Sequence, residues 1–189
     1  MANGVEDART SEGSILYPTS IALLVLALLF GFAVIPRLFH ASEGAMVGKD
    51  APDFTLEVLA NGLSADQKVL GLSSLRGSPV ILDFWATWCG PCQAEAPIVN
   101  KVAQRFRDRG LVVVGVNTSD EQGRSVAGPW ARAHGITFPI VFDPNQTANA
   151  YGVENLPTLV VISREGKIAA VRTGVTTDAE LEKLVSQVL

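Results

Sequence analysis

Cysteine and histidine are scarce in this chain, which has two of each among its 189 residues. A structural zinc site takes four Cys or His ligands, so Cys89 and Cys92 would need both His40 and His134. His40 abuts an apolar segment that we expect to lie in a membrane (see below). A zinc site is therefore disfavoured, and we expect no bound metal ion.

Positive charge is not concentrated anywhere in the chain. The formal net charge is −4, and Lys and Arg form no long run. Contacts to phosphates need clustered Lys and Arg, so nucleic-acid binding is disfavoured. The sequence also has no internal repeat and no low-complexity tract. With 48% apolar and 18% charged residues, it can form the core of one globular domain with an appendage.

The two cysteines are separated by two residues, in the sequence Trp-Cys-Gly-Pro-Cys-Gln at 88–93. They follow directly after an apolar run at 80–85. A pair at this spacing can open and close a disulfide without moving the backbone far. A structural disulfide across so short a loop would add little stability, because it constrains the unfolded chain very little. The spacing therefore favours reversible thiol–disulfide exchange.

A long uncharged apolar stretch near the start of the chain predicts a membrane anchor. Residues 21–35 contain no charge, and a helix that starts at Leu16 would be about 30 Å long, roughly one hydrocarbon thickness. We therefore divide the chain into a tail at 1–15, a transmembrane signal anchor at 16–39, a tether at 40–47 and a soluble domain at 48–189.

Two other interpretations of this stretch are weaker. A cleaved signal peptide would begin with basic residues, whereas three acids in the first 12 residues outnumber Arg9, and residues 42–44 make a weak cleavage site. A core helix that is apolar on every face would need a larger domain around it. The positive-inside rule compares the basic residues on the two sides of the stretch, which are Arg9 before it and Arg37 and Lys49 after it. More basic residues follow the stretch than precede it, so the rule does not favour an exported domain.

Strand and helix patterns alternate through the soluble domain. Apolar residues alternate with polar ones at 54–58, and continuous apolar runs at 80–85 and 111–116 are typical of buried strands. Helical spacing covers 89–109, where Pro97 is expected to cause a kink. Further strands are predicted at 140–142, 158–162 and 168–172, and further helical segments at 72–77, around 129–134, at 148–151 and at 177–188. This order predicts a mixed α/β sheet with helices on both faces.

The sequence WATWCGPCQAEAP at 85–97 resembles the active-site motif of thioredoxin-fold proteins, and more narrowly that of the membrane-anchored TlpA/ResA/CcmG group. Further matching segments are APDFTL at 51–56, SLRGSPVILDFWATWC at 74–89, FPIVFD at 138–143, YGVENLPT at 151–158 and REGK at 164–167. The resemblance covers residues 48–189 and implies a thioredoxin-like fold for them.

The resemblance gives the two cysteines different roles. Cys89 is implied to be the exposed nucleophile at the N-terminus of a helix, where free N–H groups and the helix dipole stabilise a thiolate. Cys92 is implied to be the less accessible resolving cysteine. The dipeptide Gly90-Pro91 matches that of thioredoxin, a reductant at about −270 mV, and so favours a reductase.

Three further positions are implied to contact substrate. Pro157 matches a loop proline that is cis in this fold and faces the disulfide, although the sequence alone favours an ordinary trans turn. The backbone of Leu156 is implied to pair with an extended substrate segment. Trp88 is expected to flank the disulfide, together with Gly90 and Pro91.

Two acids are candidates for a catalytic role. Asp83 lies within the apolar run, where burial would raise its pKa and allow it to accept a proton from Cys92. The alternative is an acid satisfied by a local hydrogen bond or by a lysine, although the strand at 111–116 offers no lysine. Glu95 matches an acid that tunes the cysteines in ResA-like proteins, and the alternative is a solvated helix carboxylate.

Three functions are compatible with these features. The first is an extracytoplasmic, membrane-tethered thiol–disulfide reductase without a cofactor, acting on targets such as apocytochrome c and recharged by a transmembrane donor of the CcdA/DsbD type. The second is a peroxiredoxin-like peroxidase, since GKDAPDFTL also occurs in that group, but the Pro-x-x-x-Thr/Ser-x-x-Cys context is absent. The third is a copper chaperone, which would need three residues between the cysteines.

Overall fold

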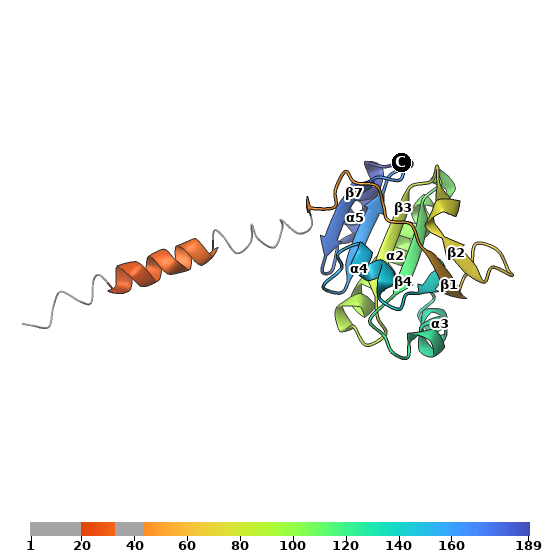
Figure 1. The fold of residues 1–189 in the computed structure, drawn as a ribbon, viewed down its shortest axis with the longest axis horizontal. Helices are drawn as coiled ribbons and strands as arrows, with labels where there is room; N and C mark the ends of the chain where they lie inside the picture. Colours follow the sequence, from red (N-terminus) through yellow and green to blue (C-terminus); the bar gives the residue numbers. More distant parts are fainter. Residues whose placement is uncertain (1–19, 33–43) are drawn as a thin grey trace, which may run out of the picture. The chain divides into compact units, whose positions relative to one another are not determined.

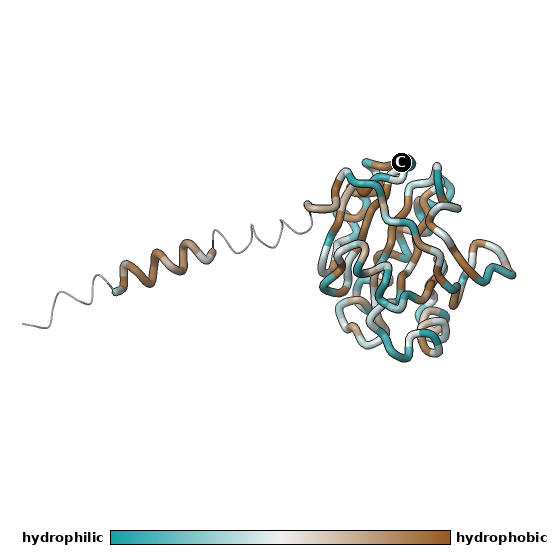
Figure 2. The backbone as a smooth tube through the Cα atoms, in the orientation of Figure 1, coloured by the Kyte–Doolittle hydropathy of each residue, from teal (hydrophilic) through white to brown (hydrophobic). Residues whose placement is uncertain are grey.

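The computed structural model describes residues 20–32 and 44–189. Residues 20–32 are helical, and Figure 2 colours most of this helix as hydrophobic. The chain divides into two units, Met1–Ser42 and Glu43–Leu189. Within the described ranges, no helix reaches the length and hydrophobicity needed to cross a membrane. The expected tail at 1–15, both ends of the expected anchor at 16–39 and residues 40–43 of the tether lie outside the described residues.

A seven-stranded mixed sheet forms the centre of the second unit (Figure 1). The strand order is β2-β1-β5-β4-β3-β6-β7, in which β3, β4 and β5 run parallel and the other neighbours pair antiparallel. The strands are β1 (Thr55–Ala60), β2 (Val69–Gly71), β3 (Val80–Trp85), β4 (Val112–Asn117), β5 (Ile140–Phe142), β6 (Thr158–Ile162) and β7 (Ile168–Thr173).

Helices cover both faces of this sheet, and a buried apolar cluster lies on each face. One cluster packs the sheet against α2 (Gly90–Phe106), α3 (Gly123–Ala133) and α5 (Asp178–Ser186). The other packs it against α4 (Gln146–Ala150) and the short 3₁₀ helix η1 (Leu72–Leu75). Every residue of β3 is buried, because helices lie over both of its faces. The mixed sheet with two covered faces is the predicted architecture.

Most predicted elements are present, with differences at their ends. Strand β2 (Val69–Gly71) was not predicted from the sequence. Helix α3 begins at Gly123, well before the predicted segment around 129–134. The predicted helix at 89–109 consists of α2 and a 3₁₀ turn, Arg107–Arg109, which Gly110 ends in the left-handed conformation with φ of 88°. Helix α2 runs without interruption through Pro97.

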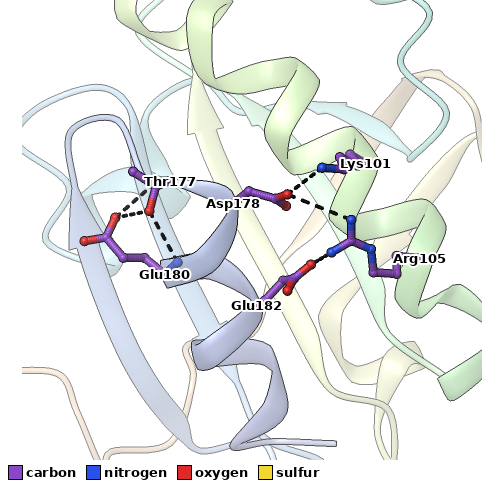
Figure 3. A network of polar contacts seen from close by, with 6 residues as sticks. All are labelled: Lys101, Arg105, Thr177, Asp178, Glu180 and Glu182. Atoms are coloured by element: carbon purple, nitrogen blue, oxygen red, sulfur yellow. Dashed lines mark hydrogen bonds and ion pairs between the residues drawn. The ribbon is translucent and has the colours of Figure 1, made fainter.

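Ion pairs at the surface join the C-terminal helix α5 to α2 (Figure 3). Lys101 Nζ lies 2.5 Å from Asp178 Oδ2, and Arg105 pairs with Glu182. Exposed pairs of this kind contribute at most about 1 kcal/mol each, so the apolar contacts beneath them hold the two helices together. A capping box formed by Thr177 and Glu180 begins α5, close to the start of the predicted helical segment at 177–188.

Candidate active site

The site lies where two parallel strands end side by side. Trp85, the last residue of β3, pairs with Asn117, the last residue of β4. The carboxyl ends of parallel strands lie at one edge of the sheet, so the segments that follow β3 and β4 are neighbours. The segment after β3 carries the two cysteines, and the segment after β4 is the loop at 118–122.

Cys89 and Cys92 form a disulfide at the beginning of α2. Cys89 is the N-cap residue of the helix, with an extended backbone conformation, and Pro91 lies in the first turn, where its missing N–H has no cost. The Sγ atom of Cys89 accepts a hydrogen bond from the backbone N–H of Cys92 at 3.2 Å. A sulfur at this position accepts a hydrogen bond from one of the unpaired N–H groups of the helix and lies at the positive end of the helix dipole. Both interactions favour a thiolate.

The expected difference in exposure between the two cysteines is not present in this disulfide form. Both residues are 4% exposed. The bond holds the Cys89 sulfur against the first turn of α2, beside Cys92, so neither side chain projects into solvent. The residues around the pair are more open: Gly90 and Pro91 are exposed, and Trp88 is 65% exposed.

The loop before β6 supplies the other predicted contact residues. The Leu156–Pro157 peptide bond is cis, as the resemblance implies, and Pro157 is buried. The carbonyl of Pro157 accepts a hydrogen bond from the N–H of Gly174 at 2.9 Å, which ties this loop to the end of β7. Leu156 is half-buried and packs against both apolar clusters.

Asp83 is buried within β3, and its side chain is on the face covered by α2. It is 5% exposed, and the strand next to it places Gly115 opposite. Burial raises the pKa of Asp83 well above its ordinary value, and the nearby charge of Glu95 raises the pKa further. Asp83 and Cys92 line the same cavity of about 10 Å³, which has room for about one water molecule.

Glu95 lies one turn after Cys92 and is 1% exposed, so the alternative of a solvated helix carboxylate is wrong. Burial raises the pKa of Glu95, and hydrogen bonds from Thr176 partly offset this effect. The backbone N–H of Thr176 donates to Glu95 Oε1 at 2.6 Å, while Oε2 has no partner in the described structure. Two acids with raised pKa values thus lie behind the cysteine pair.

Thr87 and Asp120, which are not among the predicted site residues, join the segment before Cys89 to the loop after β4. Asp120 Oδ2 accepts hydrogen bonds from the backbone N–H of Thr87 at 2.9 Å and from its hydroxyl at 2.7 Å. Polar residues directly after two adjacent parallel strands were the signal that could have found this pair.

The comparisons with known proteins agree with this geometry. A model of the AhpC/TSA family matches residues 47–171. The thiol-disulfide oxidoreductase ResA of Bacillus subtilis is 35% identical over 158 residues, which cover 83% of this chain and 84% of that protein. ResA of Geobacillus thermodenitrificans is 35% identical over 166 residues, which cover 87% of this chain and 90% of that protein.

A solved structure has the same fold. The thiol:disulfide interchange protein DsbE of Chlorobium tepidum aligns with a TM-score of 0.65 and 33% identity, covering 75% of this chain and 96% of that one. A cysteine pair at a helix N-terminus in this thioredoxin-like fold defines a thiol–disulfide oxidoreductase. The chain belongs to the AhpC/TSA family, and within it to the ResA-like oxidoreductases. The expected thioredoxin-like fold of the soluble domain and the expected enzyme class are both confirmed.

Replacing Asp83 by Asn is expected to change how stability depends on pH. Since folding raises the pKa of Asp83, its contribution to stability is full below about pH 4 and is lost as the pH rises through the raised value. The Asn variant should therefore become more stable than the unaltered chain across this window, by about 1.4 kcal/mol for each unit of raised pKa. Urea unfolding at a series of pH values measures the difference.

Asp66→Asn is the matched control, because Asp66 is exposed. Its unfolding free energy should follow that of the unaltered chain at every pH. A difference between Asp83→Asn and the unaltered chain that does not change with pH would show that Asp83 ionises as freely as a surface carboxyl.

Proposed function

We propose that the chain is a membrane-anchored, extracytoplasmic reductase that delivers electrons from Cys89 and Cys92 to protein disulfides such as that of apocytochrome c. The observation that carries the proposal is the Cys89 sulfur at the N-cap of α2, hydrogen-bonded to the N–H of Cys92. This position favours the thiolate, which is the form of cysteine that attacks a disulfide.

The reaction begins with the reduced pair. The Cys89 thiolate attacks one sulfur of the target disulfide, the target bond breaks, and its departing sulfur takes a proton from solvent. Cys92 then loses its proton and attacks the Cys89 sulfur. The mixed disulfide breaks, the second target sulfur leaves and is protonated, and the Cys89–Cys92 bond forms. Two electrons have passed from the cysteine pair to the target.

Asp83 is the proposed acceptor of the Cys92 proton. Both residues line the cavity behind the disulfide, which solvent does not reach freely. A carboxylate whose pKa is raised by burial is a stronger base than an exposed one, and its pKa is closer to that of a thiol. Glu95 is proposed to tune the same step, because its charge acts on Asp83.

The exposed residues around the cysteines are proposed to receive the substrate. Trp88, Gly90 and Pro91 offer a surface on one side of the disulfide. Leu156 lies before the cis-proline on another loop, and its backbone would pair with an extended segment of the target. Two short contacts of this kind would place the target disulfide in line with Cys89.

The proposed direction and location rest on the sequence and the family. The Gly90-Pro91 dipeptide matches that of a reducing thioredoxin. Outside the cytoplasm the pair would have to be reduced again by a transmembrane donor of the CcdA/DsbD type. The uncharged stretch within 16–39 and the resemblance to the membrane-anchored TlpA/ResA/CcmG group support an anchored, extracytoplasmic domain.

Trapping with Cys92→Ser tests the proposed chemistry and the target class together. The full chain in detergent, incubated with an oxidised Cys-x-x-Cys-His peptide, should stall as a mixed disulfide through Cys89, because the variant lacks the second cysteine of the chain that would resolve it. Mass spectrometry identifies the bond. Cys89→Ser is the control and should capture no peptide, and a disulfide peptide without the His should be captured more slowly.

Two outcomes would contradict the proposal. Capture through Cys92 in the control would reverse the two roles. If neither variant captured a disulfide peptide while the unaltered chain consumed hydrogen peroxide with dithiothreitol, the peroxidase alternative would replace the reductase.

Protease protection on spheroplasts tests the proposed location. A protease added outside should digest residues 48–189, because they would project from the outer face of the membrane, and a cytoplasmic protein should stay intact as the control. Protection of the domain until the membrane is permeabilised would place it inside the cell.

A further inference from the structure

The segment that leads into α2 is held by the loop after β4. Asp120 Oδ2 accepts two hydrogen bonds from Thr87 and a third from Asn117 Nδ2 at 3.2 Å. The indole N–H of Trp88 donates to the carbonyl of Ser119 at 2.8 Å. The two residues directly before Cys89 are therefore both tied to this loop.

Contacts on the helix side complete this arrangement. Gln93, in the first turn of α2, donates its side-chain N–H to the carbonyl of Thr87 at 3.0 Å. The N–H of Cys89 donates to the carbonyl of Ala86 at 3.2 Å. Thr87 thus links the Asp120 carboxylate on one side to the beginning of the cysteine helix on the other.

Asp120 is suited to hold this segment because it is buried and ionised. It is 8% exposed. Burial alone would raise its pKa, but hydrogen bonds from Thr87, Asn117 and the N–H of Gln122 outweigh burial and lower the pKa below its ordinary value. Hydrogen bonds to an ionised acceptor are about twice as strong as those between neutral groups.

The loop also leaves no room for a larger residue at Gly123. A Cβ atom built there would lie 1.9 Å from Asn117 Oδ1 and 3.1 Å from the Cβ of Asp120. A side chain at Gly123 would displace Asn117, which donates to Asp120. The glycine therefore allows the Asn117–Asp120 contact that helps to orient the carboxylate.

We propose that Asp120 is a positioning residue for the reduced enzyme, acting through Thr87 to keep the Cys89 sulfur at the N-cap of α2. In the oxidised form the disulfide also holds this sulfur in place. Once the bond opens, the Asp120–Thr87 contact, together with the Trp88–Ser119 and Gln93–Thr87 hydrogen bonds, keeps the segment before Cys89 in register with the helix. The inference rests on Cys89 being the attacking sulfur, as proposed above.

Loss of the Asp120 contact should therefore affect the stability of the reduced form and of the disulfide form differently. Reduction adds two electrons and one proton when Cys89 becomes a thiolate and Cys92 a thiol. Removing the Asp120 contact should destabilise this reduced form more than the disulfide form. The pKa of Cys89 should then rise towards the ordinary value of about 8.5, and the pair should become harder to reduce.

The effect of removing Asp120 must be distinguished from the effects of other charged groups near the cysteines. Glu121 lies on the same loop and lines the same surface pocket as Trp88 and Asp120. Asp83 and Glu95 lie behind Cys92. The negative charge of Asp120 itself would disfavour a thiolate, so a purely electrostatic role predicts that removing it lowers the pKa of Cys89. The positioning role predicts the opposite sign.

The test compares Asp120→Ala with Asp120→Asn in the full chain in detergent. Iodoacetamide labelling of the reduced protein across pH, read by mass spectrometry, gives the pKa of Cys89, and equilibration with oxidised and reduced dithiothreitol gives the redox equilibrium. Asp120→Ala should raise the pKa and shift the equilibrium about tenfold towards the disulfide, the size expected for losing hydrogen bonds to a charged group. Asp120→Asn keeps an acceptor oxygen, so it should shift the equilibrium much less.

Thr87→Val and Thr87→Ser provide a second comparison should Asp120→Ala fail to fold. Thr87→Val removes the hydroxyl but keeps the backbone donor. It should therefore raise the pKa of Cys89 and shift the redox equilibrium towards the disulfide, each by less than Asp120→Ala does. Thr87→Ser should restore them. The inference would be overturned if the Cys89 pKa and the redox equilibrium were unchanged in both Asp120→Ala and Thr87→Val. It would also be overturned if either substitution lowered the Cys89 pKa. If Cys89 of the unaltered chain were not the cysteine of lower pKa, the proposed function would fail first.

Discussion

The active site depends on one hydrogen bond, from the backbone N–H of Cys92 to the sulfur of Cys89. A helix leaves its first N–H groups without partners, and here a sulfur takes the place of the oxygen that usually accepts from them. The same atom can therefore be a capping group, a partner in a disulfide and a nucleophile. The sheet makes this possible, because β3 is buried on both faces and ends a few residues before the helix begins.

Behind this sulfur lie two buried carboxyl groups, and burying a carboxyl group in its charged form costs free energy. Asp83 and Glu95 are almost completely buried, and neither carboxyl is paired with a cation in the described structure. Burial penalises the charged form of each acid, and the charge of Glu95 penalises that of Asp83 further. Asp120 differs, because its hydrogen bonds keep it ionised. Carboxyls with opposite pKa shifts thus lie near the cysteine pair: Asp83 lines a cavity with Cys92, and Asp120 is bonded to Thr87, two residues before Cys89.

The sequence predicts the elements of this arrangement that depend on neighbouring residues, but not the contacts between residues that are far apart along the chain. The apolar run at 80–85, the cysteine spacing and the helical period after Cys89 are visible in short windows, so β3 and α2 were predicted nearly to the residue. The cis-proline followed only from the resemblance. The burial of Glu95 depends on Thr176, which is 81 residues away, and the contact between Thr87 and Asp120 spans 33 residues. Contacts of this kind appear only once the strand order is known.

The ionisation of the reduced chain tests the central claim most directly. Thiolate absorbance followed as the pH is raised, in the unaltered chain and in Cys92→Ser, assigns a pKa to each sulfur. If the helix N-terminus stabilises the Cys89 thiolate, Cys89 should ionise first, with a pKa below about 7.5, well under the usual 8.5 of a free cysteine. A Cys89 pKa at or above 8.5, or Cys92 ionising first, would contradict the account.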